Sequence, residues 1–168
     1  MRKILIIYCC CFIFTFINGC GVYSFTGASV SPDIKSVSIA YFPNRASILQ
    51  PSLSQVFTEK MKDKFVSQTN LTLVKSSGDL QFDGSITDYN TAPTAITGAE
   101  EAALNRLTIT VSVKFVNTKD EKQSFETTFS RFAEYDSRKN LSEVEQALIE
   151  EICNQLVDDI FNKAVINW

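Results

Sequence analysis

An alternation of apolar and polar side chains between Leu107 and Phe115 constrains the fold of this chain more than any other feature. The apolar positions are Leu107, Ile109, Val111, Val113 and Phe115, and a threonine, serine or lysine stands between each of them. This period of two predicts a β-strand with one buried and one solvated face. A sheet of this kind needs a second layer that covers one face only, so the pattern favours a two-layer domain.

Two further strands are expected earlier in the chain. The segment 35–42 alternates, and Val37, Ile39 and Tyr41 should share its buried face. The segment 80–87 alternates in the same way and predicts a second half-buried strand.

A strand that pairs with the central alternation should follow it directly. The charged tip 117–122 separates the two, which predicts a β-hairpin. In the segment 125–135 most apolar residues have one parity, but Phe132 has the other. We therefore expect a β-bulge near 130–132.

Two amphipathic helices supply the covering layer. Pro51 suits the first turn of a helix, and apolar residues recur at three- and four-residue steps from Leu53 to Phe65. Asn140, with Glu143 at the third helical position, predicts an N-cap of the capping-box type. An apolar stripe then runs from Leu141 to Ile160, which predicts a long terminal helix.

The order of elements is therefore β-α-β-β-β-α, with the short apolar run 71–74 after the first helix. A crossover through that helix should pair the first strand parallel to a later one. The expected fold class is α+β: a two-layer sandwich of a mixed, mostly antiparallel sheet of about four strands, with two helices packed on one face.

The N-terminal segment has the pattern of a bacterial lipoprotein signal. Arg2 and Lys3 precede an apolar run that ends at Ile17, which is shorter than the roughly 20 residues that a spanning helix needs. Ile17-Asn18-Gly19-Cys20 is similar to a lipobox, although Asn18 is unusual there. We expect 1–19 to be a cleaved signal peptide, Cys20 to be lipidated and to anchor the chain in a membrane, 20–33 to be a tether and 34–168 to be a single domain.

The usual catalytic and metal-binding groups are missing from the sequence. It contains no histidine, no phosphate-binding glycine motif and, after Cys20, only Cys153, which we expect to be a buried structural thiol. We therefore expect no catalytic site, metal or cofactor. An enzymatic alternative would need Asp83, Asp88, Glu100 or Glu101 to converge in a cleft. The net charge of −3 argues against nucleic-acid binding.

Two features suggest contact with another molecule. The uncharged stretch 91–99 is either an ordinary mobile loop or a surface for a partner, with Ala95, Ile96, Thr97 and Gly98 as the contact residues. The basic residues are either ordinary surface charge or a phosphate site at the start of the last helix. These basic residues are Arg106, Arg131, Arg138 and Lys139.

Taken together, the chain resembles the LptE family of lipopolysaccharide-assembly lipoproteins of the outer membrane. The resemblance covers nearly all of the chain after the signal and is carried by the order of elements and by short matches. These are Gly19-Cys20-Gly21 followed by Tyr23, the run Asn70–Val74, the strand 107–113, the segment 129–132 and the long C-terminal helix.

The resemblance implies a non-enzymatic protein that plugs and helps to assemble the LptD β-barrel, which passes lipopolysaccharide (LPS) to the outer leaflet. It implies an outer-membrane location, anchored by lipid and facing the periplasm, and direct LPS binding through basic residues. Arg138 or Lys139 matches one such position. The other falls within 96–99, where this chain has no cation; Arg106 is nearby but not aligned. The alternative is a periplasmic adaptor lipoprotein that activates a cell-wall synthase or pilots a secretin.

Overall fold

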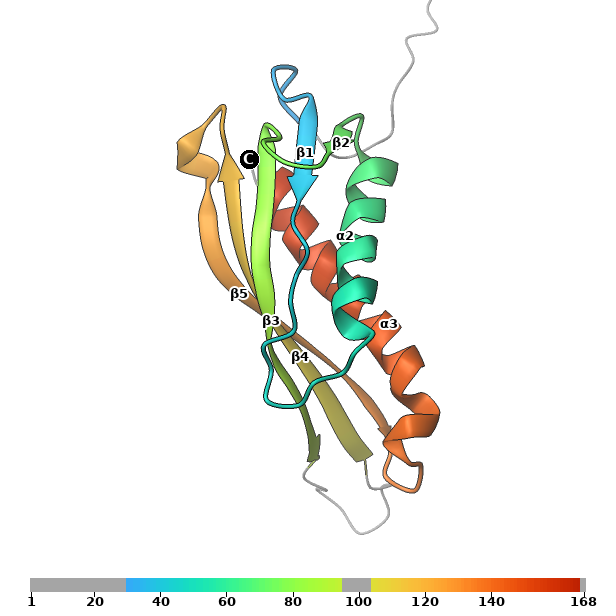
Figure 1. The fold of residues 1–168 in the computed structure, drawn as a ribbon. Helices are drawn as coiled ribbons and strands as arrows, with labels where there is room; N and C mark the ends of the chain where they lie inside the picture. Colours follow the sequence, from blue (N-terminus) through green and yellow to red (C-terminus); the bar gives the residue numbers. More distant parts are fainter. Residues whose placement is uncertain (1–29, 95–103, 167–168) are drawn as a thin grey trace, which may run out of the picture.

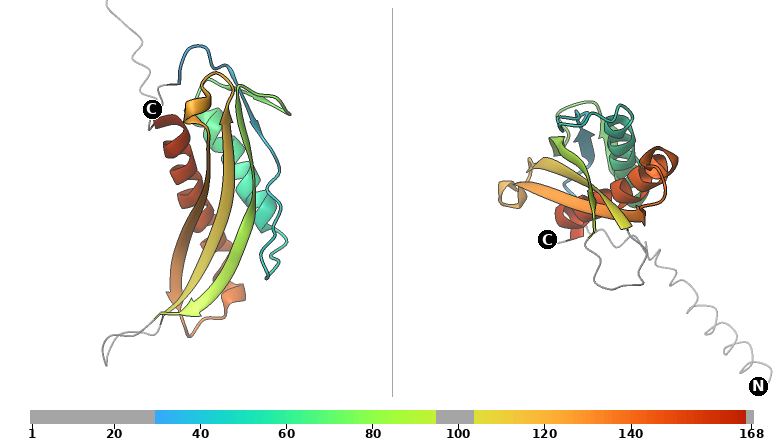
Figure 2. Two further views of the ribbon diagram at one scale, coloured as in Figure 1. Left: turned by 90° about the vertical axis from the view of Figure 1, so that its left-hand side faces the viewer. Right: turned by 90° about the horizontal axis from the view of Figure 1, so that it is seen from below.

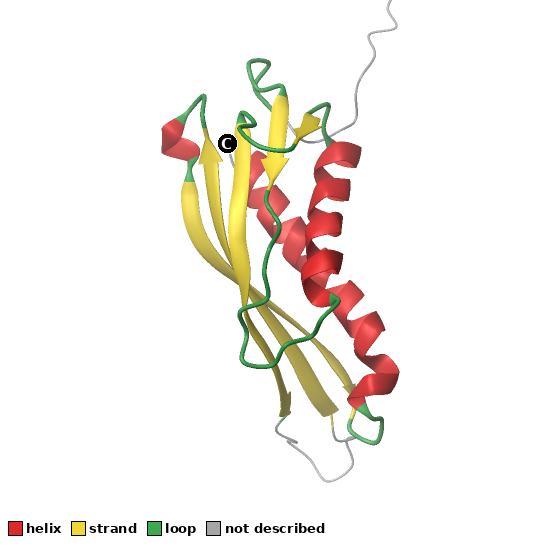
Figure 3. Ribbon diagram, viewed as in Figure 1, coloured by secondary structure: helices red, strands yellow, loops and turns green. Residues whose placement is uncertain are grey.

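The computed structural model describes residues 30–94 and 104–166 and has the predicted α+β architecture (Figure 1). A sheet of five strands forms one layer, and helices α2 (Leu53–Gln68) and α3 (Leu141–Phe161) form the other (Figure 3). The strands are β1 (Ser36–Ile39), β2 (Thr72–Val74), β3 (Leu80–Pro93), β4 (Leu104–Asn117) and β5 (Phe125–Asp136). The expected count of about four strands was too low, because the run after α2 forms the short strand β2.

The strand order is β2-β1-β3-β4-β5, and β1 is parallel to both of its neighbours, as the crossover predicts. The pairs β3–β4 and β4–β5 are antiparallel, so the predicted hairpin is confirmed. The sheet has all five strands at one end only, because β1 and β2 are short and lie there. We call this end the proximal end. At the opposite, distal end the sheet consists of β3, β4 and β5 alone (Figure 1).

The loop after β1 continues along the edge of β3. The amide of Ile86 donates to the carbonyl oxygen of Pro43 at 3.0 Å, and the amide of Arg45 donates to that of Ile86 at 2.8 Å. Tyr41 does not share the buried face of β1 as expected and is 59% exposed, whereas Phe42 is fully buried. The reason is that β1 ends at Ile39, and the Phe42 ring then turns inward onto Phe57.

The sheet contains one irregularity in its register, and it lies in β3 rather than in β5. The register shifts between Ile86 and Asp88, whereas β5 pairs with β4 without interruption from Phe125 to Asp136. The expected bulge at 130–132 was therefore wrong. Phe132 has the opposite parity because its side chain lies on the opposite face of the sheet from the helices, where it is 46% exposed.

The core lies between the sheet and the two helices and is rich in aromatic rings. Phe65 of α2 lies 4.7 Å from Phe82 of β3 and 5.1 Å from Phe161 of α3, measured between ring centroids. Phe82 in turn packs on Phe115 of β4. Each of these rings is at most 4% exposed. Because one ring of α2 contacts both the sheet and α3, the core joins all three elements, and burial of this kind is the main source of folding free energy.

The terminal helix begins where the sequence predicts, but its cap differs in detail. Asn140 is the N-cap residue, yet its side chain makes no hydrogen bond to the helix backbone. Its amide nitrogen Nδ2 donates instead to Oε1 of Glu143 at 2.9 Å. The apolar stripe is confirmed: Leu148, Ile152, Leu156 and Ile160 are all buried.

Candidate interaction surface

The face of the sheet opposite the helices is uncovered within the part of the chain that the structure describes. Both helices lie behind the strands when this face is viewed (Figure 2, left). Its side chains are mostly short and hydroxylated, because β4 and β5 each alternate apolar residues toward the helices with polar residues outward. The central hydroxyls are Thr108, Thr110, Ser112, Thr128 and Ser130, and Thr110 Oγ1 lies 2.9 Å from Ser130 Oγ.

The charged residues of this open face stand opposite one another. Nη2 of Arg106 on β4 donates to Oε1 of Glu134 on β5 at 2.6 Å, and its Nε donates to the same oxygen at 3.2 Å. Lys114 stands directly between Asp83 of β3 and Glu126 of β5 in the register. Asp88 lies on the same face opposite Thr110, with no cation beside it in the register. The open face therefore combines hydroxyl groups with charges that are only partly compensated, since acids outnumber cations.

One large apolar side chain lies on this polar surface. The guanidinium carbon of Arg106 is 3.8 Å from the centroid of the Phe132 ring, which places the cation over one face of the ring. Arg106 thus contacts both Glu134 and Phe132, and the three side chains form a single cluster on β4 and β5. The opposite parity of Phe132 is visible in the sequence, where it predicted a bulge instead of an outward side chain. The sequence therefore contained the evidence for an outward-facing aromatic side chain, but the prediction assigned it to a bulge.

The other predicted cations near this region lie at the distal end, after β5. Arg138 donates from Nε to Oδ1 of Asp136 at 2.9 Å and also from Nη2 to Oδ2. This pairing lowers the pKa of the Asp136 carboxyl and raises the pKa of Arg138. Lys139 is exposed and forms no ion pair among the described residues. The register places Arg106 at the same end, since it lies opposite Glu134, two residues before Asp136.

Arg131 does not belong to this group. It lies on the helix-facing side of the edge strand β5, where Nε and Nη2 donate to the two carboxylate oxygens of Asp159 on α3. The ion pair raises the pKa of Arg131 and ties the sheet edge to the helix. The four basic residues singled out in the sequence therefore divide into three at the distal end and one between the layers.

Several predicted residues lie outside the described part of the chain. These are Cys20 with the signal peptide and most of the tether, and the contact residues Ala95, Ile96, Thr97 and Gly98. The strand β3 extends through Thr91 to Pro93, so the first residues of the expected loop belong to the sheet. The lipidation of Cys20 and the partner contacts of 95–98 stay predictions.

Of the four acids that the enzymatic alternative needs, Glu100 and Glu101 lie outside the described residues, and the structure shows where Asp83 and Asp88 lie. No group of three or more Cys, Asp or Glu side chains in 30–94 and 104–166 is placed to hold a metal ion. The bulge in β3 turns Asp83 and Asp88 to the same face, contrary to the expectation of opposite faces, but they are five residues apart. Because the bulge adds one residue, the β4 residues opposite them, Lys114 and Thr110, are four steps apart, or about 13 Å along the sheet. This exceeds the roughly 5–9.5 Å between the carboxylates of a glycosidase.

Cys153 is fully buried in α3, as predicted for a structural thiol. Burial raises its pKa to about 12, so it is not a nucleophile near neutral pH. Among the residues described, neither helix is both long enough and apolar enough to cross a membrane.

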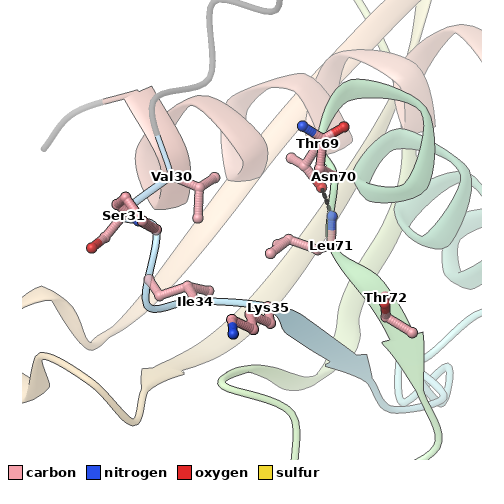
Figure 4. A pocket seen from close by; sticks show the side chains of 9 residues that line it. Val30, Ser31, Ile34, Lys35, Thr69, Asn70, Leu71 and Thr72 are labelled. Atoms are coloured by element: carbon pink, nitrogen blue, oxygen red, sulfur yellow. Dashed lines mark hydrogen bonds between the residues drawn. The ribbon is translucent and has the colours of Figure 1, made fainter.

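A hollow of about 470 Å³ lies at the proximal end, beside the first described residues (Figure 4). Its lining combines aliphatic side chains such as Val30, Ile34 and Leu71 with neutral polar groups and Lys35. Leu71 N donates to Thr69 Oγ1 across one wall at 3.2 Å. The lining contains one cation and no acid, so it has no acid–base pair for catalysis.

The outward surface of the helices differs from the open face of the sheet. The exposed residues of α3 include the acids Glu143, Glu150, Glu151 and Asp158. Lys64 of α2 pairs with Asp158 at 2.7 Å and bridges the two helices. The helix side of the domain is thus strongly acidic along α3, whereas the open face is rich in hydroxyl groups and carries a smaller excess of acids.

Fold and surface together define a two-layer α+β domain that leaves one hydroxylated face of its sheet uncovered in the described part of the chain. The sequence model of the LptE family, described as lipopolysaccharide-assembly, matches residues 34–164. The chain therefore belongs to the LptE family, as the sequence resemblance indicated.

Solved structures of similar fold include a minor lipoprotein from Acinetobacter baumannii, with 14% identity and a TM-score of 0.53 over 80% of this chain and 95% of that chain. The hypothetical protein CT253 from Chlamydia trachomatis has 10% identity and a TM-score of 0.54 over 80% of this chain and 99% of that chain. At these identities the likeness concerns the fold alone. A comparison with curated protein sequences finds no match.

Proposed function

We propose that this chain is an outer-membrane lipoprotein, anchored through Cys20 and facing the periplasm, that plugs and helps to assemble an LptD-type β-barrel for LPS transport. The observation that carries the proposal is the match of the LptE family model over 34–164. The proposed role is not enzymatic. It requires a rigid domain, an anchor and a surface that fits the polar lumen of a barrel.

The geometry of the domain supports this role. A core that joins both helices to the sheet gives the domain rigidity, while one whole face of the sheet is left polar and uncovered. The described residues include no candidate for catalysis, which agrees with a role based on contact.

We propose that direct contact with LPS occurs at the distal end, through Lys139 with Arg138 and Arg106. Lys139 is exposed beside the start of α3, where free backbone N–H groups favour an anion. Arg138 and Arg106 already pair with Asp136 and Glu134, so a phosphate would have to compete with those carboxylates. Lys139 is therefore the residue on which LPS affinity should depend most.

Purification of the lipidated protein from membranes in mild detergent tests the main proposal. A large β-barrel should co-purify in near-equal amount, and depletion of the protein should leave that barrel poorly assembled and LPS export impaired. Recovery of a cell-wall synthase or a secretin instead, with LPS export unchanged, would favour the adaptor role over the plug role. Replacing Cys20 with alanine should abolish acyl labelling, whereas unchanged labelling would refute the anchor.

A further inference from the structure

The open face of β3, β4 and β5 and the helix side of the domain differ in chemistry, and the difference indicates which side fits the wall of the barrel better. The open face carries many hydroxyls and partly compensated charges, and the helix side carries a larger excess of exposed acids on α3. We propose that the open face is the surface that lies against the inner wall of the barrel, with Phe132 on the edge strand β5 as its anchor. This inference rests on the proposed function, because it assigns the contact surface of that same partner.

The area of the open face is sufficient for a specific interface. Three strands spaced about 4.8 Å apart and 12 to 14 residues long cover roughly 14 Å by 40 Å, or about 600 Å². Specific protein interfaces bury about 600–1,000 Å² on each partner. The face therefore reaches the lower limit before any loop contributes.

The side chains of the face lose little entropy when they are covered. Threonine and serine have few rotamers to lose, whereas the lysines and glutamates of the helix side have many. Phe132 is held in place by Arg106, whose guanidinium covers one face of the ring and is itself fixed by Glu134. An exposed aromatic that is already fixed in one orientation is typical of an interface anchor.

The composition also decides among the possible occupants. Packing against a second copy of the same face would bury hydroxyls against hydroxyls, whereas paired sheets normally bury apolar faces. An LPS phosphate requires available cations, but Arg106 pairs with Glu134 and Lys114 stands between Asp83 and Glu126. The inner wall of a large barrel is built of strands with polar inward side chains, and this chemistry complements the face.

Matched substitutions on the two sides of the domain test the assignment in the full-length, lipidated protein. Ser130→Arg places a long, uncompensated cation on the open face, and Ser67→Arg makes the same change on the exposed side of α2. Phe132→Ala removes the anchor, and Val66→Ala removes an apolar side chain that is similarly exposed, at 52%, on α2. The measurements are the amount of barrel that co-purifies with each variant and the thermal unfolding of each variant alone.

We expect Ser130→Arg and Phe132→Ala to reduce barrel recovery by about tenfold, the scale of losing one interface anchor. Ser67→Arg and Val66→Ala should leave recovery within about twofold, and all four variants should unfold near the wild-type temperature. Loss of the barrel from the α2 variants with recovery intact for the open-face variants would overturn the inference while leaving the proposed function in place.

Two further outcomes have distinct meanings. If the wild-type protein itself recovers no barrel, the proposed function fails and this inference fails with it. If barrel recovery is unchanged in the open-face variants but homodimer or LPS recovery falls, the face binds a second copy or LPS, and the assignment to the barrel wall is wrong. Loss of the cooperative unfolding transition, beyond the shift of a few degrees that about 1 kcal/mol produces, would identify misfolding. In that case the milder pair Thr110→Ala on the open face and Ser67→Ala on the exposed side of α2 decides the assignment by the same measurement.

Discussion

The two faces of the sheet are built from the same strands but have opposite roles. In β4 and β5, odd-numbered residues point toward the helices and supply most of the core, whereas even-numbered residues point outward and are polar except for Leu104, Val116 and Phe132. Phe129 and Phe132 illustrate the difference, since the first packs against the core and the second lies on the open face with Arg106. The face toward the helices thus supplies folding free energy, and the open face supplies a surface for binding. A substitution at a position that faces the helices should affect stability, and one at a position that faces outward should affect binding.

The largest test of this division compares two phenylalanines. Phe65→Ala on the covered side should lower the free energy of unfolding by about 3–5 kcal/mol, because the ring joins Phe82 and Phe161 and leaves a cavity. Phe132→Ala should cost only about 1 kcal/mol, chiefly the contact with Arg106. Urea unfolding measures both values. Equal losses would contradict the division of roles.

A smaller loss of stability is expected at Gly84, where the covered face of β3 has no space for a side chain. A Cβ atom on Gly84 would lie 2.1 Å from the carbonyl oxygen of Ser112 and 2.7 Å from the Phe42 ring, so Gly84→Ala should destabilise the fold by at least about 1–3 kcal/mol. Ser85→Ala, the next residue of β3, points to the open face and should change stability by less than about 0.5 kcal/mol. Thermal unfolding of the two variants would distinguish these outcomes, and a tolerated Gly84→Ala would show that the strand can move.

Ion pairs allow a finer comparison of the faces. A double-mutant cycle on Arg131 and Asp159, which tie β5 to α3, should give a coupling of about 0.2–1 kcal/mol that decreases with added salt. The pair Arg106 and Glu134 on the open face should give a similar value in the free protein. Binding of the barrel should strengthen only the coupling of the open-face pair, because only that pair would be shielded from water. Equal strengthening of both would argue against the assigned face.

The smallest effect concerns acid stability at the distal end. The pKa of Asp136 is lowered in the folded protein by its hydrogen bonds with Arg138, so its contribution to stability is complete above its ordinary pKa of about 4. That contribution is lost as the pH falls through the lowered folded value. Asp136→Asn should therefore be less stable than the wild type at pH 7, and the difference should shrink below pH 4. A difference that stays constant over this range would refute the ion pair.

The sequence predicted the elements well because their patterns are local. The alternation at 107–115 and the stripe from Leu141 to Ile160 each determine one element without reference to the rest of the chain. It was harder to predict which face of the sheet each side chain occupies, because a bulge reverses the alternation beyond it. The bulge lies at Ile86–Asp88, where the loop after β1 pairs with β3, and that contact is not visible in the sequence. The run 72–74 was undercounted because a strand of three residues has too little pattern of its own.

The candidate site was predicted less completely than the fold. Arg106, Arg138 and Lys139 could be named as cations, but their acidic partners could not, because Glu134 and Asp136 pair with them only through the register and the turn after β5. Phe132 was visible as an exception to its strand's pattern. Its outward position became clear only when the uninterrupted pairing of β5 excluded a bulge there.

The central claim is that the open face of the sheet meets the barrel while the helices do not. A photoreactive amino acid placed at Thr110, in the centre of the open face, should crosslink in cells to a large β-barrel protein. The same amino acid placed at Glu151, exposed on α3, should give at most a small fraction of that adduct. A strong barrel adduct from Glu151 with none from Thr110 would contradict the account.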